Sequence, residues 1–217
     1  MKNERTELVF ILDRSGSMGG LESDTIGGFN AMLMKQKELK GECRITTVLF
    51  SDGLTVLHDR IDIGGVRPIT ERDYFVRGST ALLDAIGSTI DKIIKVQKKS
   101  AEEYRAGKVM FVIITDGLEN ASREYSFDRI KRKISEQKEK YGWEFFFLGA
   151  DLSAVETAAD LGISRSRAAV YNSDHKGTRL NYAVLGEAAE QFRTTGAMDE
   201  DCLAPIRDDV KKRQGKQ

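Results

Sequence analysis

An acidic residue and two hydroxyls follow directly on a run of five apolar residues near the start of the chain. The run covers residues 8–12, and Asp13, Ser15 and Ser17 come after it at every second position. Gly16 lets the loop turn tightly, so all three side chains can point at one spot. Carboxylate and hydroxyl oxygens are the ligands that hard cations such as Mg²⁺ prefer. The junction therefore predicts an oxygen-lined cation site at the end of a short strand.

A second aspartate occupies an equivalent place further along the chain. Lys108–Thr115 has the strongest strand pattern in the sequence, and Asp116 follows it. In doubly wound sheets, ligands bind beyond the carboxyl ends of the strands, where the strand order reverses. If the two strands are central neighbours, Asp13 and Asp116 face each other and repel unless a cation or proton lies between them. Thr80, just before a predicted long helix, offers a further hydroxyl from another loop.

The elements that must position these residues alternate between strands and helices. Apolar and β-branched runs predict strands at 8–12, 44–50, 54–63, 108–115, 143–148 and 168–171. Apolar residues at helical spacing predict helices at 25–39, 80–98, 126–140, 153–161 and 178–194. Alternation of this kind implies a parallel sheet covered on both faces, and the turn signal at residues 51–53 makes the third strand an antiparallel edge. We therefore predict an α/β fold: a doubly wound, Rossmann-like, mostly parallel six-stranded sheet with one antiparallel edge strand and helices on both faces.

The length and composition fit one compact domain. The chain has 217 residues, of which 40% are hydrophobic and 31% charged, and it shows no internal repeat or linker. Residues 1–197 are predicted to form this single domain. Residues 198–217 are predicted to be a charged C-terminal tail, loose after Cys202.

Bulk charge and hydropathy give no sign of a nucleic-acid or membrane partner. The 34 lysines and arginines balance 34 aspartates and glutamates, and no apolar stretch is long enough to span a bilayer. The N-terminus carries no signal-type apolar segment. Cys43 and Cys202 belong to no metal-binding spacing, as expected for reduced thiols. We therefore expect a cytoplasmic protein, and the sequence leaves its oligomeric state open.

In this order, the motifs resemble the metal-ion-dependent adhesion site of von Willebrand factor A (vWA) domains. That site combines D-x-S-x-S with a threonine in a second loop and an aspartate in a third. The matching residues here are Asp13, Ser15, Ser17, Thr80 and Asp116. The resemblance covers roughly residues 6–195. It implies that the three hydroxyls bind the metal directly, whereas the two aspartates act largely through water.

The resemblance also implies recognition of a protein partner and no catalysis. Few direct anionic ligands leave Mg²⁺ strongly electrophilic, and Mg²⁺ readily keeps waters at open positions. An Asp or Glu carboxylate of a partner protein then replaces one of these waters. Mg²⁺ is the expected ion, although Mn²⁺ or Ca²⁺ would fit the same oxygens. The chain is thus expected to be an intracellular binding module, an adaptor or scaffold in a multiprotein complex, and not an enzyme.

Two other functions stay open at this stage. Asp13 after an apolar strand is similar to the nucleophile of haloacid-dehalogenase-like enzymes, so a metal-dependent hydrolase or phosphatase using Asp13 is the alternative. Those enzymes have a second acid where this chain has Ser15, and a serine nucleophile would need a nearby histidine. A P-loop is excluded because no G-x-x-x-x-G-K-[ST] occurs. A scaffold that keeps the loops but binds no metal is disfavoured by the complete set of five residues.

Some polar residues near these loops have structural interpretations that need no metal. Thr80 would serve as the N-cap of the helix after it, and Asp52 suits a hairpin turn. Asp84, one helical turn after Thr80, is expected on a solvated helix face. Residues 153–156 predict a capping box at the start of a short helix.

Overall fold

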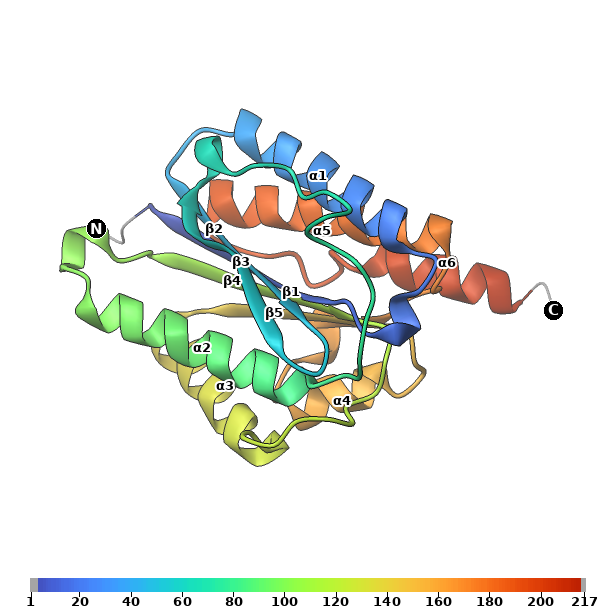
Figure 1. The fold of residues 1–217 in the computed structure, drawn as a ribbon. Coiled ribbons are helices and arrows are strands. Elements are labelled where there is room, and N and C mark those ends of the chain that lie inside the picture. The colour runs from blue at the N-terminus through green and yellow to red at the C-terminus, as the bar shows by residue number, and fades with distance from the viewer. Residues whose placement is uncertain (1–3, 216–217) are drawn as a thin grey trace.

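The computed structural model describes residues 4–215 and shows one six-stranded sheet with helices on both faces (Figure 1). The strands are β1 (Thr6–Asp13), β2 (Cys43–Phe50), β3 (Leu54–Asp62), β4 (Lys108–Thr115), β5 (Glu144–Gly149) and β6 (Ala168–Val170). Their order is β3-β2-β1-β4-β5-β6, and only the β2–β3 pair is antiparallel within the described residues. The predicted doubly wound sheet with an antiparallel edge strand is confirmed.

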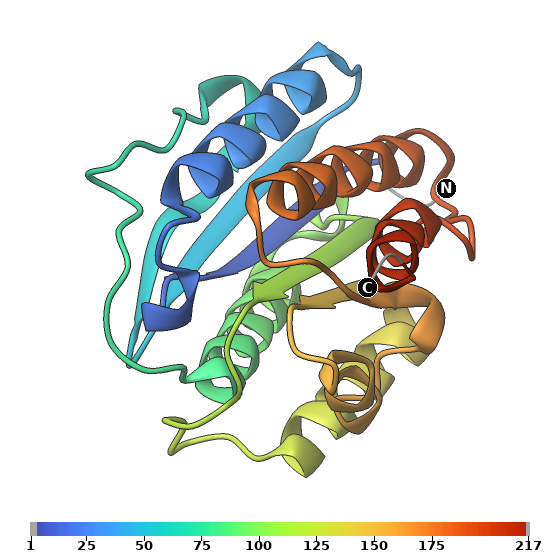
Figure 2. The same ribbon diagram turned by 90° about the vertical axis from the view of Figure 1, so that its right-hand side faces the viewer.

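Residues of α1, α5 and α6 pack in the core on one face of the sheet, and residues of α2, α3 and α4 in the core on the other (Figure 2). The helices are α1 (Glu22–Glu38), α2 (Leu82–Lys99), α3 (Phe127–Tyr141), α4 (Ala154–Asp160), α5 (His175–Thr195) and α6 (Ala204–Gln214). The alternating side chains of β1 explain its unbroken apolar run at residues 8–12. Phe10 packs into the core under α1 and α5, whereas Ile11 packs into the core under α2 and α3. Both faces of this central parallel strand are buried, so every position of the run at residues 8–12 is apolar.

The register places the ends of β1 and β4 side by side. Leu12 pairs with Ile114 across these two strands, and Asp13 is the last residue of β1. The chain continues from β1 toward β2 on one side and reaches β4 on the other, so the strand order reverses between them. The loops that carry Asp13 and Asp116 therefore leave the sheet at the same edge.

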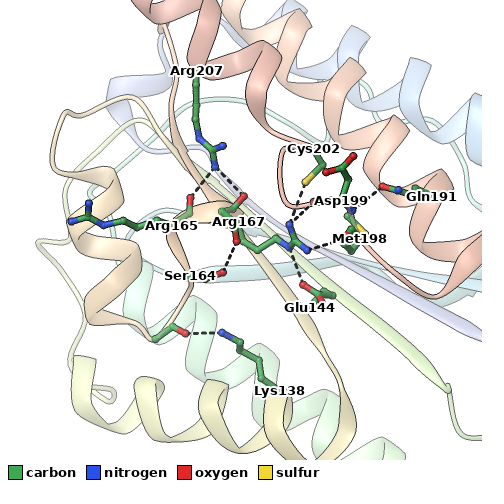
Figure 3. Close-up of polar contacts among 12 residues, drawn as sticks. Lys138, Glu144, Ser164, Arg165, Arg167, Gln191, Met198, Asp199, Cys202 and Arg207 are labelled. Carbon is green, nitrogen blue, oxygen red and sulfur yellow. Dashed lines mark hydrogen bonds and ion pairs between the residues drawn. The ribbon is translucent and has the colours of Figure 1, made fainter.

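The segment after residue 197 differs from the sequence expectation of a loose tail. It contains α6, whose Ile206 is buried in the same core as α1 and α5. Arg207 donates through Nη2 to the carbonyl oxygens of Arg165, Ser166 and Ala168, at 2.8, 2.9 and 3.1 Å. Figure 3 shows Arg207 reaching the segment that carries Arg165. Ile206, Arg207 and the hydrogen bond from Asn172 to Asp209 at 2.9 Å are among the contacts that dock this otherwise charged helix. These contacts are long-range, which is why composition alone missed them. The domain boundary drawn at residue 197 stays a prediction.

Asp24 links the first turn of α1 to the first turn of α5. Its buried carboxylate accepts a hydrogen bond from Arg179 Nε at 2.7 Å and another from His175 Nδ1. The hydrogen bond from His175 is the main cause that holds the pKa of Asp24 below its usual value, and it outweighs the opposing effect of burial. The contact joins two helices that flank the loop carrying Asp13.

Replacing Asp24 by asparagine is expected to lower the free energy of unfolding by about 1 kcal/mol near pH 7. This loss of stability is small for hydrogen bonds between charged groups because His175 and Arg179 are largely exposed. Since the folded-state pKa is depressed, the stabilisation is present above the unfolded-state pKa and is lost as the pH falls through the folded-state pKa. Urea denaturation of both proteins between pH 7 and pH 3 should show the gap closing in acid. Equal stabilities at pH 7 would contradict this assignment.

Candidate metal centre

Asp13 is held rigidly at the end of β1. Its side chain is only 1% exposed, and both carboxylate oxygens accept hydrogen bonds. The Ser15 backbone amide donates to Oδ1 at 2.7 Å, and Thr115 Oγ1 donates to Oδ2 at 2.6 Å. The Tyr74 hydroxyl donates to the carbonyl oxygen of Asp13. These bonds fix the carboxylate between β1 and β4 and leave it no freedom to rotate.

Three hydroxyl groups surround one point above Gly117, which lies in the loop after β4. Two come from the loop after β1 and one from the loop before α2. A β-carbon placed on Gly117 would lie 2.8 Å from Thr80 Oγ1, 3.0 Å from Ser17 Oγ and 3.6 Å from Ser15 Oγ. Ser15 Oγ and Ser17 Oγ are themselves 3.1 Å apart. We call this arrangement of Ser15, Ser17 and Thr80 around Gly117 the hydroxyl cradle. It stays open because residue 117 has no side chain.

The backbone ties the first two loops together. The amide of Gly16 donates to the carbonyl oxygen of Gly78 at 3.1 Å. The amide of Arg77 donates to the carbonyl oxygen of Arg14 at 2.8 Å. Gly78 has φ +67°, and a β-carbon there would lie 2.6 Å from Asp52 Oδ1. Only glycine combines this left-handed backbone with so close an approach. The local sequence therefore sets where Thr80 lies relative to the two serines.

The loop after β4 holds Thr80 from the other side. Asn120 Oδ1 accepts from the Thr80 amide at 2.9 Å, and the Asn120 amide donates to the Thr80 carbonyl oxygen at 3.1 Å. Thr80 is not the N-cap that the sequence suggested: α2 begins at Leu82, and Glu119 Oε2 accepts from the Leu83 amide at 2.8 Å. The Thr80 hydroxyl is left to face the cradle.

Asp84 has a structural role that the sequence analysis assigned wrongly. Its carboxylate does not lie on a solvated face but accepts from the backbone amides of Arg123, Glu124 and Tyr125 at 2.8 to 2.9 Å. The sequence shows an acidic residue in the first turn of a long helix. It does not show which backbone amides that residue binds, because they lie about 40 positions further along the chain. Asp84 therefore anchors the far end of the loop that carries Gly117.

The predicted capping box at residues 153–156 is also absent. The Ser153 hydroxyl makes no capping hydrogen bond to α4, and Asp151 Oδ1 instead accepts from the Ser153 amide at 2.8 Å. Asp52, in contrast, lies in the β2–β3 turn as expected and accepts from the Ser51 hydroxyl at 3.0 Å. The acids at this edge thus serve mainly to fix loop backbones.

Asp116 is half-buried and faces a loop that the sequence analysis did not consider. Ser173, just before α5, donates through Oγ to Asp116 Oδ2 at 2.5 Å. Burial raises the pKa of Asp116; the hydrogen bond from Ser173 lowers it, and the nearby charge of Asp13 raises it further. The sequence analysis did not identify Thr115 and Ser173, whose hydroxyls donate to the carboxylates of the predicted aspartates, or Tyr74, which donates to the Asp13 carbonyl oxygen. Thr115 could have been predicted, because it directly precedes Asp116 in the sequence. Ser173 could not, because only the fold brings it next to Asp116.

The structure brings all five predicted residues to one edge of the sheet, and their chemistry fits a hard divalent cation. Three neutral hydroxyls lie around one point, with two carboxylates close enough to influence each other's charge. Within residues 4–215, no group of three or more His, Cys, Asp or Glu side chains is arranged to hold a metal. The candidate centre at this edge is therefore built mainly from hydroxyls, and the ligand roles of its residues stay predictions.

Solved structures share this architecture at low sequence identity. The manganese-loaded TRAP protein of Plasmodium vivax aligns with a TM-score of 0.58 and 16% identity, over 88% of this chain and 74% of that one. Proximal thread matrix protein 1 from the mussel byssus, with a zinc-occupied adhesion-site motif, aligns at 0.54 and 14%, over 88% and 47%. The von Willebrand factor type A protein of Catenulispora acidiphila aligns at 0.55 and 15%, over 87% and 43%. The chain has the fold of a von Willebrand factor A domain.

At these identities the likeness establishes the vWA fold and leaves activity open. The chain spans about half the length of the mussel and Catenulispora proteins. Neither protein-family models nor the sequences of curated proteins match this chain.

Two hollows flank the hydroxyl cradle on the metal-site edge of this vWA fold. One, of about 820 Å³, is polar and includes Ser79, Asp84 and Asn120 in its wall. The other, of about 290 Å³, lies beside Asp116 and is largely apolar. Leu118 lies in the wall of the apolar hollow and is 57% exposed. Leu152, between the wall residues Asp151 and Ser153, is 76% exposed. The edge thus combines a polar centre with exposed apolar side chains.

Proposed function

We propose that this chain is a protein-binding module that holds a divalent cation, Mg²⁺ in the cell, and through it engages an Asp or Glu carboxylate of a partner protein. The observation that carries the proposal is the convergence of three hydroxyls above Gly117 with Asp13 and Asp116 close by. Ser15, Ser17 and Thr80 would hold the ion, and the two aspartates would balance its charge through water. The manganese-loaded and zinc-occupied states of the similar solved structures support a divalent ion at such an edge.

The bound ion would supply a Lewis-acidic position for a carboxylate. The chain's own residues set how strong that position is. Three hydroxyls donate no formal charge, and the hydrogen bonds from Ser15 and Thr115 absorb part of the charge on Asp13. An ion held this way remains electron-poor and gains most from an anionic ligand brought by a partner.

The geometry favours binding over the hydrolase alternative. Both oxygens of the Asp13 carboxylate are engaged, so it is poorly placed to attack a substrate as a nucleophile. His175 Nδ1 bonds to Asp24 and His58 Nδ1 bonds to Thr47 Oγ1, so neither histidine is paired with Ser15 or Ser17. The proposed activity is therefore recognition, without a catalytic step.

Exposed apolar side chains around the cradle suit a protein partner. Leu118, Leu152 and Phe75 are exposed. The guanidinium groups of buried Arg14 and exposed Arg77 stack on Phe75, at 5.2 and 5.5 Å from the ring centre. Exposed aromatic and arginine side chains are enriched in protein interfaces. A carboxylate on the metal, surrounded by such contacts, is the kind of interface that we propose.

An intracellular adaptor or scaffold role is part of this proposal. Cys43 and Cys202 are both free thiols within the described residues, which supports a reducing compartment. Within residues 4–215, no helix combines the length and apolarity needed to cross a bilayer.

Affinity capture from the native cell tests the proposal. Partners should bind the wild-type chain in Mg²⁺, and should be lost in chelator and with Asp13→Asn. Asp59→Asn is the matched control, because it removes a surface carboxylate on β3 that pairs with Lys92 outside the cradle. Partners that bind equally with chelator, or equally to the Asp13→Asn variant, would contradict metal-mediated binding.

A further inference from the structure

A separate cavity of about 370 Å³ lies at the opposite end of the sheet from the hydroxyl cradle. Its wall includes Gly107, which directly precedes β4, and Trp143, which directly precedes β5. The amino ends of these strands point away from the edge that carries Asp13 and Asp116. Residues near the C-terminal ends of α2 and α3 complete the wall. We call it the Trp143 cavity.

The wall of the Trp143 cavity has an apolar, aromatic part. Trp143 is 5% exposed and stacks on Phe111, with ring centres 5.6 Å apart and an interplanar angle of 18°. Ile94 from α2 and the ring of Tyr141 from α3 also contribute. The stacking fixes the indole, so the cavity has a rigid flat wall against which an apolar body can pack.

The rest of the wall is cationic. Lys98, Arg105 and Lys140 line the cavity, and none of its described lining residues is acidic. Both hollows beside the hydroxyl cradle, in contrast, include acids in their walls. Lys140 pairs with Glu136 one turn earlier in α3, which offsets part of the positive charge. The cavity still presents more positive than negative groups.

Gln97 adds a buried hydrogen-bond donor to this wall. Its Oε1 accepts from the Ala106 amide at 3.0 Å, which fixes the orientation of the side-chain amide. Its Nε2 is buried and has no hydrogen-bond partner among the described residues. A buried donor without a partner costs free energy, so the Gln97 side chain would gain by turning its Nε2 toward an acceptor bound in the cavity.

Helix electrostatics account for only part of this pattern. Lys98 and Lys140 lie in the last turns of α2 and α3, where cations compensate the partial negative charge of a helix end. Arg105, from the loop before β4, belongs to the same pattern, because its Nε donates to the carbonyl oxygen of Ser100, the C-cap of α2, at 3.0 Å. Helix electrostatics do not explain the unpartnered Nε2 of Gln97. The indole, the three cations and the absence of acids from the described wall together fit a ligand with an apolar body and an anionic group.

We propose that the Trp143 cavity binds a small molecule with an aromatic or aliphatic body and one anionic group, a carboxylate or a sulfonate. The body packs against Trp143 and Ile94. The anionic group faces the cations at the rim. The site is independent of the metal and of the function proposed for the hydroxyl cradle.

The single tryptophan of the chain gives a direct readout. The probe is 8-anilinonaphthalene-1-sulfonate, and the matched neutral probe is N-phenyl-1-naphthylamine, which has the same rings without the sulfonate. Excitation of Trp143 should produce energy transfer to the sulfonate probe, with affinity roughly tenfold above that for the neutral probe if three exposed charge contacts contribute. Trp143→Phe should abolish energy transfer while the probe, excited directly, still binds.

Two lysine variants on α2 test the charge contribution. Lys98→Gln should weaken binding of the sulfonate roughly threefold and leave the neutral probe unchanged. Lys95→Gln is the control, because Lys95 is exposed on the same helix outside the cavity wall. Absence of energy transfer, equal affinity for the two probes, or equal effects of the two lysine variants would each overturn the proposal.

Discussion

Gly117→Ala is expected to abolish stabilisation of the chain by Mg²⁺ and to leave the metal-free fold intact. The new methyl carbon would lie 2.8 Å from Thr80 Oγ1 and 3.0 Å from Ser17 Oγ, where the ion would lie. The Gly117 backbone has no positive φ, so alanine adds no backbone strain there. Thermal melts with and without Mg²⁺ measure the effect. The wild-type chain should gain about 2.7 kcal/mol at a hundredfold excess of Mg²⁺ over Kd, and the variant close to none.

Gly53→Ala is the matched control for this experiment. A β-carbon on Gly53 would meet nothing within 4 Å, although Gly53 lies at the same edge in the β2–β3 turn. This variant should keep the full Mg²⁺-induced shift. Retention of the shift in Gly117→Ala would show that the ion does not occupy the cradle.

Asp13→Asn is expected to weaken Mg²⁺ binding by about 100-fold, the upper range for a residue that acts on a metal through an intervening ligand. Asparagine keeps the shape of the side chain, and its oxygen can still accept from the Ser15 amide. The amide nitrogen can donate to Thr115 Oγ1, which now donates to Asp13 Oδ2 at 2.6 Å. The negative charge is therefore lost with little loss of hydrogen bonding. Isothermal titration with Mg²⁺ measures the change in affinity.

Asp13→Ala separates the metal role of Asp13 from its structural role. It removes the acceptor of the buried Ser15 amide, so it should lower the metal-free free energy of unfolding by about 2 kcal/mol in addition to weakening Mg²⁺ binding. Denaturant unfolding without metal should rank Asp13→Asn close to the wild-type chain and Asp13→Ala below it. Mg²⁺ affinity unchanged in both variants would contradict the account of Asp13.

Strand runs and the order of motifs predicted most of the fold. The central parts of β1 and β4, residues 8–12 and 109–114, are apolar at every position because both faces of a central parallel strand are buried, and that pattern is visible in the sequence alone. Helix α6 was missed because its docking depends on Ile206 and on the contacts of Arg207 with the segment before β6. Such contacts are long-range, and local composition carries no trace of them.

For the candidate metal centre too, one part could be predicted from the sequence and another could not. Asp13, Ser15, Ser17, Thr80 and Asp116 were found from their places at the ends of predicted elements. The residues that support them were not. Asn120, Glu119 and Asp84 connect the loop after β4 to the start of α2 across some 36 to 41 positions, and Ser173 reaches Asp116 across 57. Polar residues in loops suit many partners, so only the folded arrangement selects which ones meet.

The most direct test of the metal centre is a crystal structure of the chain grown with Mn²⁺, examined by anomalous scattering. Mn²⁺ takes the same oxygen ligands as Mg²⁺ and can be located by its own signal. The account predicts a single strong peak inside the hydroxyl cradle, within about 2.2 Å of the oxygens of Ser15, Ser17 and Thr80. The peak should be absent in Gly117→Ala crystals. A wild-type crystal without a peak at this place, or with Mn²⁺ bound elsewhere, would contradict it.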